Sequence, residues 1–305
     1  MRIARGAAFV PAHISGFFQP FILRSPERSG SRNCGPCLEV GVRTEVHAEP
    51  SERSSVEVII DGEPAPEART SRLAAWEVLA RAGGKYRVRI VHRCEVPVGA
   101  GYGASGAGAL GTAIALSSAL GLGMKREEIV RAAHRAEVMC RTGLGDVGAQ
   151  AIGGLVLTIS PGAPPHGAWR RIRVPGDLRI VCATLGTMST KEVLANRAAM
   201  RRVGLAGRRA FERVESRPTL KEFLAASKGF MEESGLADDE IVEVVEIAER
   251  AGAMGASQAM LGRSVFALCR GTLAGRVRDE IRRRRPDSHL MIAGVRGRGP
   301  ETPGP

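Results

Sequence analysis

The chain has 305 residues, 44% of them hydrophobic and 25% charged, which is enough for one large or two ordinary globular domains with a buried core. No apolar run approaches the ~20 residues of a membrane span, and no signal-peptide pattern begins the chain, so we expect a cytoplasmic protein. The net charge of +12 suggests a nucleic-acid partner, but aromatic residues make up only 4% and none lies beside the densest basic run, Arg282 to Arg285. A solvated helix end explains that run better, and a diffuse positive field would attract anionic small molecules.

The first half of the chain alternates strands with helices. Strands are expected at 38–48, 55–60, 87–93 and 154–159, and helices at 71–82, 105–120 and 126–140. A stretch rich in Pro and Gly at 161–167 suggests a domain boundary.

The second half has the same mixture. Strands are expected at 178–183, 264–269 and 288–293, and helices at 190–203, 219–233, 239–251 and 272–284. This pattern predicts an α+β fold with helices packed to one side of the strands. We therefore divide the chain into domains at 1–165 and 166–295, followed by a tail rich in Gly and Pro (296–305) that we expect to be disordered.

Cys34 and Cys37 form a Cys-Gly-Pro-Cys sequence that resembles a thioredoxin redox motif. In that fold the motif opens a helix, whereas here an alternating strand pattern follows. The other four cysteines are single and far apart, so no zinc-ligand set is complete. We interpret the motif as a turn with two incidental cysteines, which could form a disulfide.

The most informative segment is the glycine-rich stretch 97–108, Pro-Val-Gly-Ala-Gly-Tyr-Gly-Ala-Ser-Gly-Ala-Gly. It lies between an alternating strand and a helix of small residues. Glycines allow the backbone to come close to a ligand, and the following helix presents open N–H groups and the positive end of its dipole. The segment therefore predicts an anion site, most often one for phosphate.

Several phosphate motifs share such glycines. Gly101, Gly103 and Gly106 spell the dinucleotide fingerprint, but a second helix follows where that fold needs a strand ending in an acidic residue. A Walker A loop is excluded because no Gly-Lys-Ser/Thr follows. A nucleophile elbow would have glycine at Ala107 and a histidine partner for Ser105. On spacing alone, a purely structural loop remains open.

A second cluster follows about 40 residues later and supplies the carboxylates that phosphoryl transfer needs. Glu137 lies near the end of the 126–140 helix, and Asp146 lies in the glycine-rich turn Thr-Gly-Leu-Gly-Asp-Val-Gly. A lone Asp in such a turn is usually a cap. Beside a phosphate loop it becomes a candidate general base for a substrate hydroxyl.

These motifs resemble those of the GHMP kinases, the family of galactokinase, homoserine kinase and mevalonate kinase. Pro97-x-x-x-Gly101-x-Gly103-x-Ser105 is similar to their central ATP motif, and Thr142-Gly143-x-Gly145-Asp146 to the segment with their catalytic aspartate. Residues 11–16 and 252–259 resemble their first and third motifs. The resemblance implies a domain like ribosomal protein S5 domain 2 followed by a ferredoxin-like domain.

Residues 11–18, 30–32, 101–108 and 256–262 further resemble archaeal family members that act on pantoate. This implies ATP-dependent phosphorylation of its primary hydroxyl to 4-phosphopantoate, on the archaeal route to coenzyme A. One alternative is a family member for mevalonate, homoserine or another small hydroxy acid. An alternative from another class is a non-catalytic basic protein that binds nucleotide or nucleic acid. The partners expected are pantoate and ATP, without specific nucleic acid or membrane, and a homodimer is left open.

The resemblance also assigns roles to individual residues. The residues expected to bind ATP are Pro97, Gly99, Gly101, Gly103, Ala104, Ser105, Gly106 and Ala107. Ser105 and Glu137 would hold Mg²⁺, and Asp146 would take the hydroxyl proton, with His13 standing where many family members have lysine. The residues expected to contact substrate are Ser31, Arg32 and Thr142, with Arg32 as the bidentate partner of the substrate carboxylate.

Overall fold

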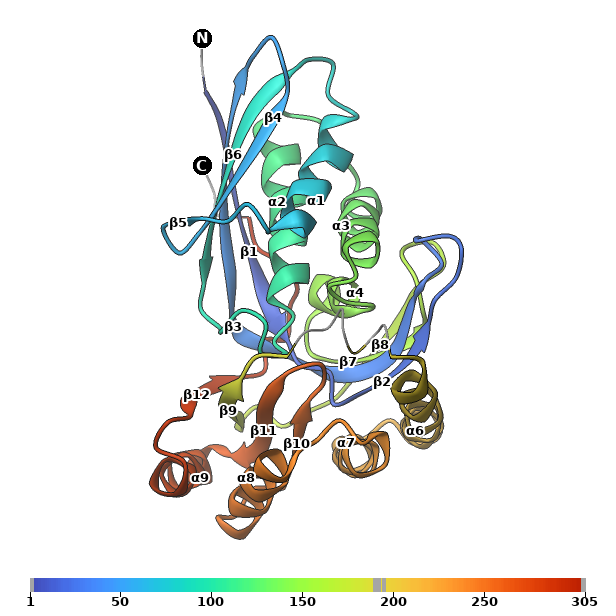
Figure 1. Ribbon diagram of the computed structural model, residues 1–305, viewed down its shortest axis with the longest axis vertical. Helices are drawn as coiled ribbons and strands as arrows, with labels where there is room; N and C mark the ends of the chain where they lie inside the picture. Colours follow the sequence, from blue (N-terminus) through green and yellow to red (C-terminus); the bar gives the residue numbers. More distant parts are fainter. Residues whose placement is uncertain (1–2, 189–192, 194–195, 303–305) are drawn as a thin grey trace.

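A computed structural model describes residues 3–188, 193 and 196–302, which form two β-sheets with helices (Figure 1). The first sheet contains β1 (Ala4–His13), β2 (Phe17–Phe21), β3 (Gly30–Pro50), β4 (Ser55–Ile60), β5 (Glu63–Pro64), β6 (Tyr86–Cys94), β7 (Leu155–Ser160) and β8 (Ala168–Ile172). The second contains β9 (Leu178–Gly186), β10 (Gly255–Ala259), β11 (Arg263–Arg270) and β12 (His289–Gly294). The helices are α1 (Arg69–Leu79), α2 (Ala104–Ala119), α3 (Arg126–Cys140), α4 (Asp146–Ile152), α6 (Arg197–Ser216), α7 (Leu220–Ser234), α8 (Asp239–Arg250) and α9 (Gly271–Arg284).

The 21-residue strand β3 organises the first sheet. Its later part pairs antiparallel with β1 and β6, and its earlier part pairs with β2 and β7. β8 continues the sheet beyond β7, and β4 pairs parallel with β6. Strand β3 runs from the outer end of the sheet to the junction with the second sheet, and its partners change along the way (Figure 1).

Helices α1 to α4 cover one face of the first sheet (Figure 1). Small residues let α2 lie close to the strands. A Cβ added at Gly6 of β1 would lie 2.1 Å from the Ala115 carbonyl oxygen, and one at Gly111 of α2 would lie 2.4 Å from Thr44 Oγ1. This close packing fixes the direction in which the N-terminus of α2 points.

The second sheet has the strand order β10-β11-β9-β12 with antiparallel pairing throughout, as in the ferredoxin-like domain that the family resemblance implied. α8 and α9 pack on it around a core that includes Val244, Val277 and Ile281.

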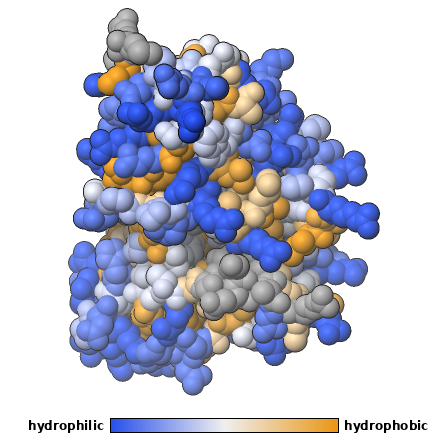
Figure 2. Space-filling model, turned by 45° about the horizontal axis from the view of Figure 1, so that its top comes forward, coloured by the Kyte–Doolittle hydropathy of each residue, from blue (hydrophilic) through white to orange (hydrophobic). Residues whose placement is uncertain are grey.

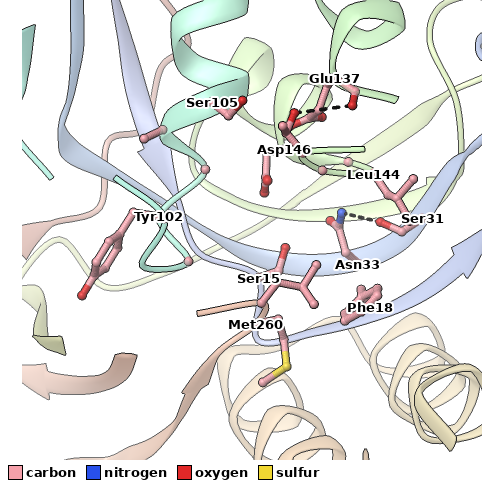
Figure 3. Close-up of a pocket in the computed structure, with 18 residues that line it drawn as sticks. Ser15, Phe18, Ser31, Asn33, Tyr102, Ser105, Glu137, Leu144, Asp146 and Met260 are labelled. Atoms are coloured by element: carbon pink, nitrogen blue, oxygen red, sulfur yellow. Dashed lines mark hydrogen bonds between the residues drawn. The ribbon is translucent and has the colours of Figure 1, made fainter. Parts of the chain in front are cut away.

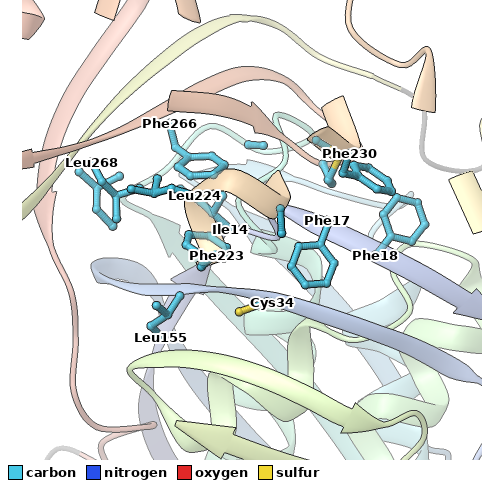
Figure 4. Close-up of a cluster of buried hydrophobic side chains, with 14 of the residues drawn as sticks. Ile14, Phe17, Phe18, Cys34, Leu155, Phe223, Leu224, Phe230, Phe266 and Leu268 are labelled. Atoms are coloured by element: carbon cyan, nitrogen blue, oxygen red, sulfur yellow. The ribbon is translucent and has the colours of Figure 1, made fainter. Parts of the chain in front are cut away.

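A single hydrophobic core joins the two domains (Figure 4). Phe18 of β2 lies 5.7 Å from Phe230 of α7, and Phe223 lies 5.9 Å from Phe266 of β11, measured between ring centroids. The contact of Phe18 with Phe230 crosses between the domains, and the contact of Phe223 with Phe266 packs α7 on the second sheet.

The α+β class is confirmed, and the elements expected between 38 and 159 occur close to their expected bounds. In the second half, the expected helix at 190–203 lies partly outside the described residues. Within them, α6 begins at Arg197 and ends at Ser216. The sequence patterns missed six elements: β1, β2, β5, β8, β10 and α4.

Two expectations near the domain junction are wrong. β8 hydrogen bonds to β7, so the first sheet continues to Ile172, beyond the expected boundary at 165. Cys34 and Cys37 lie in the extended strand β3 and not in a turn, and both are buried free thiols.

The tail expected to be disordered is ordered over residues 296–302. The Phe9 N–H donates to the Glu301 carbonyl oxygen (2.8 Å) and the Glu301 N–H donates to the Phe9 carbonyl oxygen (2.9 Å). The Arg296 guanidinium lies 4.7 Å from the centre of the Phe9 ring and 2.8 Å from the Glu301 carboxylate. Backbone pairing with β1 therefore overrides the Gly and Pro content that predicted disorder.

Hydrophilic side chains dominate the surface seen in Figure 2.

The arginine run, Arg282 to Arg285, lies at the end of α9, and Arg285 pairs with Glu240 (2.9 Å) and Glu243 of α8. Within the described ranges, every helix is too short or too polar to cross a membrane.

Candidate functional site

A cavity lies where the first sheet, the start of α2 and the turn between β10 and β11 meet (Figure 3). Segments far apart in the sequence form its walls. Its lining residues include Ser15, Phe18, Ser31, Asn33, Gly99, Gly101, Tyr102, Gly103, Ala104, Ser105, Glu137, Thr142, Gly145, Asp146, Met260 and Leu261.

The loop before α2 has the backbone expected of an anion site. Gly99, Gly101 and Gly103 have φ angles of +76°, +92° and +63°, a region that residues with a Cβ rarely adopt. No described side chain caps α2, and Ala104 and Ser105 of its first turn line the cavity. The open N–H groups and the helix dipole therefore favour an anion at this wall.

Glu137, near the end of α3, is a completely buried carboxylate. Neither carboxylate oxygen has a hydrogen-bond partner among the described residues. Burial raises the pKa of Glu137 well above its usual range, and the negative charge of Asp146 raises that pKa further. A Cβ at Gly106 would lie 2.8 Å, and one at Gly143 2.3 Å, from Glu137 Oε1, so these glycines provide its space. A buried carboxylate of this kind needs a proton or a cation.

Asp146 begins α4, and its Oδ1 lies 2.7 Å from Nδ1 of His13. His13 is fully buried at the end of β1, whereas the Asp146 side chain is 23% exposed. The imidazole, which does not line the cavity, therefore contacts one carboxylate oxygen of Asp146 and leaves the other available to the cavity. Gln150 of the same helix donates from Nε2 to the Gly103 carbonyl oxygen (2.8 Å), which links α4 to the glycine loop.

A buried polar pair on β3 faces Asp146 across the cavity (Figure 3). Asn33 Nδ2 donates to Ser31 Oγ (3.0 Å), and Thr158 Oγ1 donates to Asn33 Oδ1 (2.9 Å). A Cβ at Gly145 would lie 2.3 Å from Asn33 Nδ2, so the turn before Asp146 packs directly against this pair. Sequence reasoning selected Ser31 but missed Asn33, although residues two apart on a strand share a face.

Arg32 does not line this cavity, contrary to its expected contact with a substrate carboxylate. It lies on the other face of β3, where its Nε donates to the Ile159 carbonyl oxygen (3.1 Å). Its guanidinium lies 4.5 Å from the centre of the Phe211 ring. Thr142 does line the cavity, but its hydroxyl lies 3.0 Å from that of Thr70.

The structure brings most of the expected residues to one place. Those that line the cavity are Ser31, Gly99, Gly101, Gly103, Ala104, Ser105, Glu137, Thr142 and Asp146. Those that do not are His13, Arg32, Pro97, Gly106 and Ala107. His13 and Gly106 instead contact or shape the space of the two carboxylates.

The carboxylates also bear on metal binding. Within 3–188, 193 and 196–302, no cluster of three or more His, Cys, Asp or Glu side chains could hold a metal ion by itself. The cavity instead offers the carboxylates of Glu137 and Asp146 and the hydroxyl of Ser105. This set fits Mg²⁺, which takes one or two carboxylates and completes its shell with water and phosphate oxygens. The unpartnered oxygens of Glu137 are the observation that supports the fit.

A second cavity adjoins the first and shares Gly99, Ala104, Ser105 and Thr142 with it. It lies between β6, α1 and the glycine loop, and its lining combines aliphatic side chains such as Val42, Ile60 and Val98 with polar and charged ones. In its wall His92 Nε2 lies 2.8 Å from Ser71 Oγ. Burial lowers the pKa of His92 to about 4, so this imidazole is neutral near pH 7. A partly apolar cavity that continues into an anion site suits a base attached to phosphates.

Comparisons with known proteins agree with this geometry. The family model for the GHMP kinases N terminal domain matches residues 70–154, and that for the GHMP kinases C terminal matches residues 209–287. The first match contains the glycine loop, Glu137 and Asp146.

Curated relatives and solved structures extend over more of the chain. Pantoate kinases from Thermococcus kodakarensis and Methanospirillum hungatei are 32% and 34% identical to it, covering 86% and 88% of this chain and 87% and 89% of theirs. A solved structure described as a phosphotransferase related to the CoA biosynthesis pathway has a TM-score of 0.89 and 28% identity, with 99% of each chain covered.

Proposed function

This chain belongs to the GHMP kinase family, and from that premise we propose that it transfers the γ-phosphoryl group of ATP to the primary hydroxyl of pantoate, giving 4-phosphopantoate. It is a phosphotransferase with an alcohol group as acceptor. The choice of pantoate is supported by the archaeal pantoate kinases that align with most of its length.

One observation carries the catalytic part of the proposal: Asp146 lies at the edge of an anion site, held from behind by His13 (2.7 Å). A general base must have a fixed direction and a free oxygen near the attacking hydroxyl. The buried imidazole supplies the first condition, and the cavity-facing position of Asp146 supplies the second.

The two adjoining cavities, which share Gly99, Ala104, Ser105 and Thr142, are the proposed nucleotide site. In this proposal, the base and ribose occupy the cavity beside His92, and the phosphates follow the loop from Gly99 to Ser105. The N-terminus of α2 then binds the phosphate oxygens through open N–H groups, which are already in place before the reaction.

Ser105 and Glu137 are the proposed ligands of Mg²⁺, with Asp146 close by. When bound, the ion neutralises charge on the β- and γ-phosphates. Glu137 is suited to this role because its oxygens are buried without partners. The glycines at 106 and 143 keep the space around Glu137 Oε1 free of side-chain atoms.

Asp146 then accepts the proton of the acceptor hydroxyl. The hydroxyl oxygen forms a bond to the γ-phosphorus as the bond from that phosphorus to the bridging oxygen breaks, which releases ADP. Ser31 and Asn33 face the base across the cavity and are the proposed hydrogen-bond partners of the acceptor. Since both are buried, with Thr158 bonded to Asn33 and Asn33 bonded to Ser31, they can orient a small acceptor at little entropic cost.

The proposal is tested by incubating the protein with MgATP and, separately, pantoate, pantothenate, mevalonate and homoserine, with ADP release as the measurement. ADP release that depends on pantoate is expected, and its absence would refute the proposed acceptor. Ser31→Ala should raise KM for pantoate. Arg32→Lys is the matched variant on the opposite face of β3, and it should leave that KM unchanged. A rise for Arg32→Lys alone would instead support Arg32 as the partner of the substrate carboxylate.

A further inference from the structure

Tyr102, at the centre of the glycine loop, connects the loop to the second domain. It stands between Gly101 and Gly103, and only 1% of it is exposed. Figure 3 shows its ring directed away from the cavity, although its backbone belongs to the cavity wall. The side chain is part of the core that joins the two domains.

The Tyr102 hydroxyl forms a hydrogen bond with a pair of hydroxyl groups in the second sheet. Its oxygen lies 2.8 Å from Thr184 Oγ1 on β9, and Ser264 on β11 donates to the same Thr184 oxygen (3.2 Å). Thr184 and Ser264 are register partners in the sheet, so their positions are fixed by backbone pairing. Burial raises the pKa of Tyr102, which keeps the phenol neutral and able to donate or accept a hydrogen bond.

The backbone of Tyr102 acts on the catalytic pair. Its carbonyl oxygen accepts the backbone N–H of His13 (3.0 Å), and the His13 imidazole in turn contacts Asp146. The neighbouring loop is also closely packed against the turn between β10 and β11. A Cβ at Gly262 would lie 2.1 Å from the Ala100 carbonyl oxygen, and one at Gly101 would lie 3.1 Å from the Ala259 carbonyl oxygen.

The residues on either side of Tyr102 are glycines, so neighbouring groups must restrain this part of the loop, and Gln150 already does so at the Gly103 carbonyl oxygen. Gly101 and Gly103 have no side chain, and glycine loses more conformational freedom on ordering than any other residue. A loop that binds phosphates must hold its N–H groups in place before the ligand arrives. A buried side chain between the two glycines provides a further restraint.

We propose that Tyr102 is a positioning residue, whose bond to Thr184 sets the phosphate loop and whose carbonyl oxygen sets His13, and through it Asp146. This rests on the proposed function for the identity of the reaction. The geometry makes the arrangement of the catalytic groups depend on the second sheet, which contributes no expected base or metal ligand.

The test compares Tyr102→Phe, which removes only the hydroxyl, with Thr184→Val and the conservative Thr184→Ser. A net hydrogen bond corresponds to about a three- to tenfold effect, so kcat should fall by that factor in Tyr102→Phe and Thr184→Val. Thr184→Ser should keep the wild-type kcat. The double variant should be no worse than Thr184→Val alone, because Thr184→Val already removes the bond to Tyr102 together with the bond from Ser264.

A control separates positioning from simple stability. Ser227→Ala removes another fully buried hydroxyl in the second domain, one that donates to the Phe223 carbonyl oxygen (2.7 Å). It should lower Tm and leave kcat unchanged. If Tyr102→Phe and Thr184→Val lower Tm but leave kcat, KM and nucleotide affinity at wild-type values, Tyr102 is only a core residue and the proposal is wrong.

The affinity for a non-hydrolysable ATP analogue, measured without acceptor, keeps this test independent of pantoate. Tyr102→Phe should weaken that affinity about threefold, since the loop must be ordered on binding. If the wild type does not act on pantoate, the proposed function fails while the nucleotide affinity still tests Tyr102. If pantoate is phosphorylated and both kcat and nucleotide affinity of Tyr102→Phe are unchanged, the inference about Tyr102 fails alone.

Discussion

Replacing Glu137 with glutamine should stabilise the metal-free protein and at the same time reduce its activity. Glu137 is completely buried, its oxygens have no partner among the described residues, and the charge of Asp146 lies close by. Gln has nearly the same shape, so it fits the space beside Gly106 and Gly143 without creating a cavity. The substitution removes a buried charge but also removes the proposed Mg²⁺ ligand.

The expected size follows from two opposing terms. An uncompensated buried charge costs about 3–5 kcal/mol, and an unsatisfied buried amide costs about 1–3 kcal/mol. The difference is about 2 kcal/mol in favour of Glu137→Gln. For a chain of this length it corresponds to a rise in Tm of about 4 °C.

The pH dependence gives the sign of the effect. The pKa of Glu137 is raised in the folded state, so the folded protein retains a proton that the unfolded chain loses as the pH rises above the ordinary carboxyl range. The stability of the folded protein is therefore unaffected by Glu137 below the ordinary carboxyl range. It falls as the pH rises through the raised pKa of Glu137 in the folded protein. Glu137→Gln should lack this loss, and its advantage should disappear at low pH.

Thermal unfolding in EDTA at several pH values measures this difference. Glu57→Gln is the matched control, because Glu57 is 61% exposed and its pair with Arg89 (3.9 Å) is at the surface. Mg²⁺ with an ATP analogue should raise the Tm of the wild type more than that of Glu137→Gln. A Glu137→Gln protein that is less stable than wild type in EDTA at neutral pH, with an unchanged response to Mg²⁺, would refute the reasoning.

Other variants and probes test the remaining parts of the site. Asp146→Asn should lower kcat by about 10²–10⁴-fold and leave the affinity for an ATP analogue within about threefold of wild type, because it removes the base and not the phosphate loop; equal losses in both would contradict the assignment. Gly106→Ala should raise the Mg²⁺ concentration needed for half-maximal activity, since its Cβ would lie 2.8 Å from Glu137 Oε1, and an unchanged Mg²⁺ titration would count against that contact. Cys34 and Cys37 should not react with a thiol reagent until the protein is denatured, because burial raises the pKa of both thiols; fast reaction in the native state would show that β3 is accessible.

The features that could be predicted from the sequence are local ones. The glycine loop and the start of α2 were identified because the turn, its positive φ angles and the helix N-terminus all lie within a dozen neighbouring residues. The same is true of Asp146 in its glycine turn. Motif spacing was enough here, since the chemistry needs these residue types close together in the chain.

The errors arose where long-range pairing decides the outcome. Arg32 and Asn33 are neighbours in sequence, and only the pairing of β3 with β2 and β7 determines which of them faces the cavity. A change of one residue in register reverses the face of every side chain on a strand. Arg32 was therefore assigned to the substrate, and Asn33 was missed.

Tertiary contacts also determined the order of the tail, the domain boundary and the partners of buried groups. Residues 296–302 belong to a tail expected to be disordered from its composition, but the backbone of Phe9 on β1 forms hydrogen bonds with Glu301. Periodicity thus established the α+β class, and the glycine-rich motifs indicated the anion loop and the carboxylate proposed as the base. The contacts of His13 with Asp146 and of Tyr102 with Thr184 could be found only in the folded chain. The first joins β1 to the start of α4, which packs on the first sheet, and the second joins the glycine loop to β9 of the other domain.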